Sequence, residues 1–192
     1  PVTPGVLDLI SDYQRARSLT RRPMKFTVTS PHMLSRTLLD RHYRNPAELA
    51  MALADVLASQ LKHIDSDVIQ IDEANVTGSP QDAEWAVPAI NRVLDAIPKG
   101  KGVHLCFGNY GGQTIQKGTW QRLIQFMNQL HADHVVLEMA RRAPAELEAL
   151  KDLDPKIQIG LGVIDIKSTV AESPDEVARR IEQGEKILGE GS

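Results

Sequence analysis

One short stretch of this 192-residue chain combines two residue types that bind metals or act as nucleophiles. The segment "VHLCFGN" (103–109) contains His104 and, two positions later, Cys106, the only cysteine in the sequence. In a β-strand, residues two apart point to the same face with Cα atoms roughly 6.5–7 Å apart, so this imidazole and thiol could share one ion. Both residue types are also common in protein cores, so the pair alone does not decide between a metal site and packing.

A glutamate at the end of the next predicted strand favours the metal. Glu138 closes the apolar segment "VVLE", and burying an unpaired carboxylate there is costly. It therefore needs a bound cation or a salt bridge, for which Arg141 and Arg142 are the neighbours in sequence. Imidazole, thiolate and carboxylate together suit zinc, which takes nitrogen, sulfur and oxygen ligands and needs a fourth. The sequence has no second cysteine to supply it.

Two adjacent carboxylates, Asp72 and Glu73, end another predicted strand, "VIQIDE". Successive strand residues face opposite sides, so only one of the two points toward the site. The inward carboxylate would bind a substrate ammonium group or act as a base, and the alternative is that it caps a helix or orders a loop. The glycines of "FGNYGGQT" (107–114) predict either a tight turn or a backbone cradle for the anionic end of a ligand.

The other histidines are not expected to carry chemistry. His131 and His134 span a predicted junction between helix and strand, where their rings should diverge instead of sharing a metal. His32, His42 and His63 lack convergent partners in the sequence and are expected at the surface or at helix ends.

Five segments rich in β-branched and apolar residues alternate with helical patterns. The strands are predicted at 24–30, 67–73, 102–108, 134–140 and 157–166. Asn45 and Ser173, each followed by proline, predict the starts of two of the helices. The alternation predicts an α/β fold of parallel strands joined by right-handed crossovers. An open doubly wound sheet and an eight-stranded (β/α)8 TIM-type barrel both fit, and polar residues at the end of every strand favour the barrel.

Composition limits the partners and the compartment. The chain is 42% apolar, carries a net charge of −3 and has no apolar run long enough to span a membrane. These values predict a globular protein with no nucleic-acid or membrane partner, and the single cysteine is typical of the reducing cytoplasm. The one basic cluster, "RARSLTRR" (15–22), is expected to be a solvated helix end.

The order of four motifs resembles a known family. "VIQIDEAN", "HLCFGN", "VVLEMA" and "IGLGVIDIKS" resemble the strand ends of the catalytic barrel of cobalamin-independent methionine synthase and its shorter relatives, over residues 24–188. In that family a His-x-Cys pair, a glutamate on the next strand and a cysteine of a later Pro-Asp-Cys-Gly segment hold zinc. The resemblance implies that His104, Cys106 and Glu138 are metal ligands, and that Asp72 contacts the amino group of homocysteine.

The sequence departs from the family pattern at two points. Lys167 stands where methionine synthases carry a histidine, and a lysine stays charged and binds anions. It is therefore expected to bind the substrate, and it points toward the shorter relatives, some of which alkylate other thiols. The chain is also expected to be a single, incomplete barrel domain (1–192) with about five β/α units, lacking the family's early strands and its last zinc-ligand segment.

The resemblance implies a zinc-dependent thiol methyltransferase, most simply one that methylates homocysteine from a folate or corrinoid donor. Its partners would be a small-molecule thiol and that methyl donor. Alkyl transfer to another thiol, such as a coenzyme M type epoxide opening, is an alternative within the family. A non-catalytic scaffold, in which these residues only pack, is a third. An incomplete barrel has open sheet edges, which a second chain in a homo-oligomer would cover.

Overall fold

The computed structural model of the chain describes residues 1–189, which contain one sheet of five parallel strands. The strands are β1 (Lys25–Thr29), β2 (Val68–Glu73), β3 (Lys101–Leu105), β4 (His134–Glu138) and β5 (Gln158–Gly162). Their order in the sheet is their order in the sequence, and every neighbouring pair is parallel. Each strand therefore pairs with the strand that precedes it in the sequence, always on the same side of the sheet.

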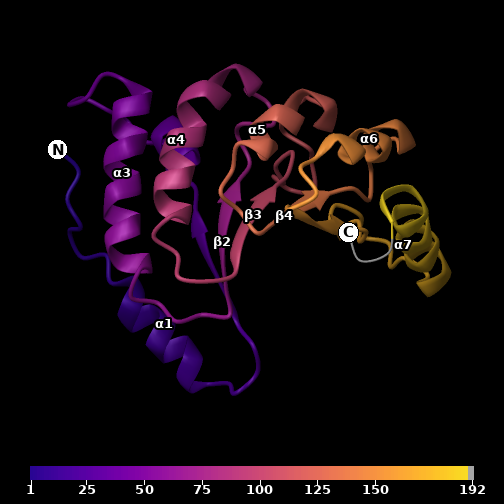
Figure 1. Cartoon of the computed structure of the whole chain (residues 1–192), viewed down its shortest axis with the longest axis horizontal. Coiled ribbons are helices and arrows are strands. Elements are labelled where there is room, and N and C mark those ends of the chain that lie inside the picture. The colour runs from indigo at the N-terminus through magenta and orange to yellow at the C-terminus, as the bar shows by residue number, and fades with distance from the viewer. Residues whose placement is uncertain (190–192) are drawn as a thin grey trace.

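Helices fill the connections between the strands. They are α1 (Leu9–Ser18), α2 (Pro31–Thr37), α3 (Pro46–Leu61), α4 (Ala83–Leu94), α5 (Ile124–Asn128), α6 (Pro144–Ala149) and α7 (Pro174–Leu188), with 3-10 turns η1 (Pro80–Asp82), η2 (Trp120–Leu123) and η3 (Leu150–Asp152). Right-handed crossovers that all advance in one direction place the intervening helices on one side of the sheet. Figure 1 shows α3, α4, α5 and α6 one after another from left to right, in their order along the chain, with the colours running from indigo at α1 to yellow at α7.

This strand order distinguishes the two predicted architectures. A doubly wound sheet reverses direction at a switch point, whereas a (β/α) barrel adds its strands consecutively. The order β1-β2-β3-β4-β5 contains no reversal, so the prediction of about five barrel-type β/α units is confirmed. Several strands end earlier than predicted. β3 ends at Leu105 and not at residue 108, so that Cys106 lies just beyond it, and β5 ends at Gly162 and not at residue 166, so that Asp165 and Lys167 lie in the following loop.

Local signals in the sequence account for the helix starts. The Asn45 side chain accepts a hydrogen bond from Ala47 N, which caps α3 as expected. Ser173 and Glu176 form a reciprocal capping box at the start of α7. No helix within residues 1–189 is long and apolar enough to cross a membrane.

The two faces of the sheet have opposite character. Ile69, Ile71, Val103, Leu105 and Leu137 are fully buried on the face that the helices cover. Alternate residues point to the other face, which carries polar side chains and glycines and is only partly buried. We call it the open face; in a closed barrel it would be the interior.

His32 lies at a helix end, as expected, but it is buried and has convergent partners, which the sequence did not predict. Its side chain is 0% exposed at the start of α2, with Nδ1 3.0 Å from Glu73 Oε2 and Nε2 3.2 Å from Asp82 Oδ2. The Ser30 hydroxyl donates to the same Glu73 oxygen, and the Trp85 ring packs on the imidazole with centroids 4.7 Å apart. These partners come from segments 41 to 53 residues away along the chain, and no local pattern announces them.

The surroundings of this buried pair shift both pKa values toward the charged forms. Burial alone would lower the pKa of His32, but hydrogen bonds to Glu73 and Asp82 and their negative charges outweigh it, so that the pKa is raised above 6.5. Burial alone would raise the pKa of Glu73, but the hydrogen bond and charge of His32, with the Ser30 hydroxyl, hold it below 4.5. The pair thus ties α2 to the end of β2.

This pair predicts a pH-dependent stability. Because the pKa of His32 is raised on folding, its contribution is complete below about pH 6.5 and is lost as pH rises through the folded value. Replacing His32→Gln should lower the free energy of unfolding by about 3 kcal/mol at pH 6 and by less at pH 9, because a buried charge loses its partner. Urea unfolding of both proteins between pH 5.5 and 9 measures this difference in the free energy of unfolding. His63→Gln, at an exposed position, is the control; equal pH profiles for wild type and His32→Gln would refute the idea.

Candidate active site

Strand register brings the predicted site residues into rows across the open face. Thr29, Asp72, His104, Val136 and Gly160 are paired in one row, from β1 to β5. In the next row toward the carboxyl ends, Glu138 pairs with Gly162, and Cys106 directly follows the end of β3. Paired residues of parallel strands point to the same side, so the polar side chains of β2, β3 and β4 emerge together. The glycines of β5 allow a close approach of this strand to β4, because a Cβ atom on Gly162 would come within 2.8 Å of Leu137 O.

Asp72, not Glu73, is the carboxylate on the open face. Glu73 points the other way, into the pair with His32. The Asp72 carboxylate accepts a hydrogen bond from Gln70 Nε2 at 2.7 Å, and Lys25 Nζ donates to Gln70 Oε1 at 2.8 Å. An ammonium group only donates, so Lys25 fixes the orientation of the Gln70 amide and turns its NH2 group toward Asp72. Sequence reasoning did not single out Gln70 or Lys25, although their period-two spacing places them on the face of Asp72 and Thr27.

His104 and Cys106 leave β3 toward the open face, whereas Val103, Leu105 and Phe107 are fully buried on the helix side. Burial raises the pKa of the Cys106 thiol above 9.0; the Gly108 amide opposes that rise and the Glu138 charge adds to it. Near neutral pH the side chain is therefore a thiol, a poorer metal ligand and nucleophile than a thiolate.

Glu138 has a partner that the sequence did not suggest. Its Oε1 forms a salt bridge with Lys167 Nζ, and its Oε2 accepts a hydrogen bond from Phe107 N at 3.1 Å. The Lys167 side chain is only 2% exposed, and its ammonium also lies 3.3 Å from Thr114 Oγ1. Both carboxylate oxygens are thus engaged by donors of this chain, and the charge is compensated by a buried ammonium.

The two arginines expected to pair with Glu138 have other partners, so that alternative was wrong in its details. Arg141 binds Asp165, with Nε 2.8 Å from Oδ2, and Arg142 binds Glu146 at 2.7 Å. Asp165 also accepts from the Lys167 backbone N–H at 3.0 Å. Asp165 thus connects the main chain at Lys167 to Arg141 in the loop after β4.

The loop after β3 is a tight turn, the plainer of its two predicted forms. Gly108, Gly111 and Gly112 have positive φ angles of 75°, 58° and 78°, which favour glycine. Ile115 N and Gln116 N both donate to Phe107 O, which closes the loop on itself. The turn brings Thr114 to Lys167.

His131 and His134 have different neighbours, as expected. His131 Nδ1 lies 2.8 Å from Asp95 Oδ1 near the surface. The His134 ring lies over Gly102 on the open face, where a Cβ atom on that glycine would come within 2.6 Å of Nε2.

The donor types on the open face suit zinc, but one of them, Glu138, is already engaged by other groups. His104, Cys106 and Glu138 supply nitrogen, sulfur and oxygen from neighbouring strands. Within residues 1–189, no group of three or more His, Cys, Asp and Glu side chains is close enough to hold a metal ion. Glu138 is turned to Lys167 and Phe107, so it would have to exchange the ammonium for a metal.

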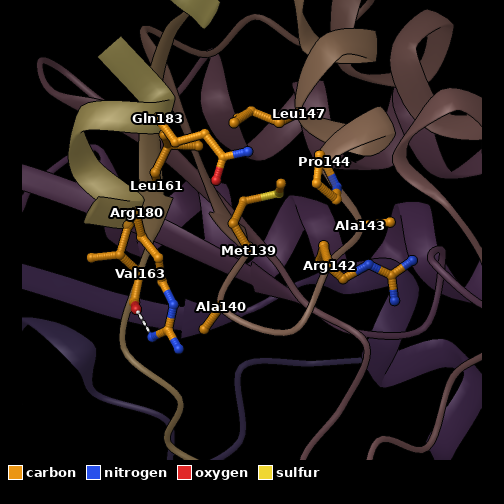
Figure 2. Close-up of a pocket in the computed structure, with 10 residues that line it drawn as sticks. All are labelled: Met139, Ala140, Arg142, Ala143, Pro144, Leu147, Leu161, Val163, Arg180 and Gln183. Atoms are coloured by element: carbon orange, nitrogen blue, oxygen red, sulfur yellow. Dashed lines mark hydrogen bonds between the residues drawn. The ribbon is translucent and has the colours of Figure 1, made fainter. Parts of the chain in front are cut away.

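A cavity of about 170 Å³ lies elsewhere, on the helix side of the sheet between the ends of β4 and β5 and helices α6 and α7. Figure 2 shows Met139 and Leu147 in its wall and the Arg180 guanidinium turned to the Val163 carbonyl, 2.7 Å away. It shares no residue with the open face, and Arg142 and Arg180 in its wall are paired with glutamates. We assign it to packing.

Comparison with known proteins identifies the family. Residues 8–190 match the family described as cobalamin-independent synthase, catalytic domain. Methionine synthase of Thermococcus kodakarensis is 30% identical over 165 residues, which cover 84% of this chain and 46% of that protein. The 2-hydroxypropyl-CoM lyase of Xanthobacter autotrophicus is 27% identical over 205 residues, covering 90% of this chain and 54% of that protein. The chain thus spans about half the length of these relatives.

A solved structure supports the fold. A B12-independent methionine synthase from Shewanella sp. W3-18-1, in complex with selenomethionine, matches with a TM-score of 0.86 and 22% identity over 100% of this chain and 59% of that one. At that identity the match establishes the fold alone. Together with the sequence match over nearly the whole length, it shows that this chain belongs to the cobalamin-independent synthase catalytic domain family.

Proposed function

We propose that this chain forms part of the active site of a zinc-dependent thiol methyltransferase, with homocysteine S-methylation as its simplest reaction. The observation that carries the proposal is the placement of Asp72, His104, Cys106 and Glu138 together on one open face, in a chain of this family. The similarity to methionine synthases supports the same reaction class.

The chain's own residues would bind and orient the thiol substrate. The Asp72 carboxylate, held by Gln70, offers an acceptor for the substrate's ammonium group. Lys167 offers a cation for its anionic group. The overall reaction replaces the substrate S–H bond with an S–CH3 bond and breaks the bond between the methyl carbon and its donor. The thiol proton ends on the nitrogen of a demethylated folate, or in solvent when the donor is a methylcorrinoid.

The proposed metal site consists of His104, Cys106 and Glu138. A bound zinc ion would favour ionisation of the substrate thiol, because a metal-bound thiol loses its proton far more readily than a free one. Before zinc binds, Cys106 has to lose its proton and Glu138 has to leave Lys167. We therefore expect zinc uptake to be stronger at higher pH.

Lys167 favours a second class of substrate, thiols that carry a sulfonate group. Lys167 places an ammonium group at the position where methionine synthases carry a histidine, and such a group suits a thiol with a sulfonate group. A relative named for a coenzyme M lyase activity supports this alternative.

The cellular setting also belongs to the proposal. We expect a cytoplasmic protein with no nucleic-acid or membrane partner. Within the described residues, β1 and β5 each pair on one side only, and such edges are normally covered. Further barrel strands, or a second copy in a homo-oligomer, would cover them.

Thioether formation tests the proposed activity. The intact polypeptide, with zinc added, should convert homocysteine or 2-mercaptoethanesulfonate to a methyl thioether when methyltetrahydrofolate or methylcobalamin is supplied, and mass spectrometry would detect the product. Propylene oxide with the sulfonate thiol tests the epoxide reaction. If no thiol is alkylated by any of these donors and the protein neither contains nor takes up zinc, the scaffold interpretation replaces this one.

Asp72 is expected to set the affinity for thiols that carry an amine. Asp72→Asn should raise KM for homocysteine by about 10- to 100-fold with a smaller change in kcat, because a charge-assisted hydrogen bond is lost in ground and transition states alike. Steady-state kinetics measure this. The sulfonate thiol, which has no ammonium group, is the internal control. An equal loss with both thiols would contradict the assignment.

The single cysteine gives a direct test of the local charges. Because the pKa of Cys106 is raised, iodoacetamide should alkylate the metal-free protein more slowly at pH 7.5 than it alkylates a free thiol. Glu138→Gln removes a charge that raises this pKa and should speed the reaction several-fold. Mass spectrometry of timed samples measures the rate. Glu148→Gln, at an exposed position, should leave the rate unchanged, and a slower reaction in Glu138→Gln would count against this electrostatic account.

A further inference from the structure

Lys167 occupies the place beside Glu138 that a metal cation would take. Its ammonium forms a salt bridge with Glu138 Oε1, is 3.3 Å from Thr114 Oγ1, and belongs to a side chain that is 2% exposed. A carboxylate that is itself largely buried needs such a compensating charge. One positive group therefore already satisfies the requirement that a zinc ion would satisfy.

The two cations cannot share Glu138 freely. A zinc ligand donates an oxygen lone pair to the metal, and an adjacent ammonium group both withdraws that lone pair and repels the incoming ion. With Phe107 N bound to Oε2 at 3.1 Å, the oxygen facing Lys167 is the one that a metal would have to take.

We propose that Lys167 is an internal competitor of the metal. Its ammonium holds Glu138 when no metal is bound; zinc displaces it, and the displaced ammonium becomes the group that binds the anionic end of the thiol substrate. This inference rests on the proposed function and adds an order of binding to it: the metal binds first, and its binding makes Lys167 available to the anionic group of the substrate.

The loop supports a movement of the side chain alone. Asp165 accepts from Lys167 N at 3.0 Å and binds Arg141, so the main chain at this point is held. The lysine side chain has four rotatable bonds and can leave Glu138 without a change of the backbone. Beside it, Gly160 and Gly162 of β5 carry no side chain that would compete for Glu138 or for the lysine.

Competition and release imply coupling between the two ligands. If zinc frees Lys167 for an anion, an anion that binds the free lysine must strengthen zinc binding by the same factor. Ethanesulfonate, which has the sulfonate but no thiol to chelate zinc, is a suitable probe for this effect.

The test measures zinc affinity, not turnover. Metal-free wild type and Lys167→Met are titrated with zinc against a chromogenic chelator, with Lys117→Met as the matched control at an exposed position in the neighbouring loop. We expect Lys167→Met to bind zinc about tenfold more tightly or better, the change that corresponds to removing one largely buried ion pair. Lys117→Met should stay within about twofold of wild type. Lys167→Arg, which keeps the charge, should stay close to wild type as well.

A second measurement needs no variant. Lys167 in the wild-type protein should be modified slowly by acetic anhydride because its amine is buried and paired, and zinc should speed that modification several-fold. Mass spectrometry of peptides reports the site, and exposed lysines serve as internal standards.

The outcomes separate this inference from the proposed function. Zinc binding of equal or lower affinity in Lys167→Met, or unchanged Lys167 acetylation on zinc binding, overturns the competition and leaves thiol alkylation standing. Zinc binding by neither protein overturns both. Tighter binding in Lys167→Met that ethanesulfonate no longer strengthens, although it does so in wild type, supports the inference even if homocysteine is not the substrate.

Discussion

The parallel register of the sheet is the constraint on which the rest of the site depends. Ile71, Val103 and Leu137 are fully buried against the helices, and each alternates with a residue of the open face. A slip of one residue would expose these apolar side chains and bury Asp72 and His104, so packing on one face determines which groups reach the other. The chemistry of the open face is thus a consequence of the apolar pattern behind it.

The two carboxylates of the open face are each compensated by a lysine from elsewhere in the chain. Glu138 is paired directly with Lys167, whereas Asp72 is connected to Lys25 through the Gln70 amide. The direct pair neutralises its carboxylate, and the indirect one orients its carboxylate while leaving it able to accept another donor. This difference explains why Asp72 suits an ammonium ligand as it stands, while Glu138 suits a metal only after an exchange of partners.

Patterns that are local in sequence predicted the fold well. The caps at Asn45 and Ser173 and the five strands follow from residue types that act on their own neighbourhood, whereas the consecutive strand order was expected from the polar strand ends and the family resemblance. The errors concern contacts between distant segments. His32 was expected to lie at the surface or at a helix end without convergent partners, because its partners lie far along the chain.

The partner of Glu138 was missed for a related reason. Sequence proximity suggested Arg141 or Arg142, but Asp165 and Glu146 take these arginines. Because β5 ends at Gly162, the chain turns early and carries Lys167 back over β4. Strand periodicity was enough to predict that His104 and Cys106 share a face. The pairing of Glu138 with Lys167 could not be predicted in this way, because it depends on where β5 ends.

The spacing of the strands gives the displacement of Lys167 a further reason. Asp72 lies on β2 and Glu138 on β4, two strands apart, which is roughly 9–10 Å at the usual spacing. The ammonium and carboxylate of an α-amino acid are attached to one carbon atom. A lysine held at Glu138 therefore lies on the β4 side of β3, away from the strand that carries Asp72. In the proposed exchange, a flexible side chain released from Glu138 extends across β3 toward Asp72, so that one movement would free the carboxylate for a metal and bring the ammonium nearer to Asp72.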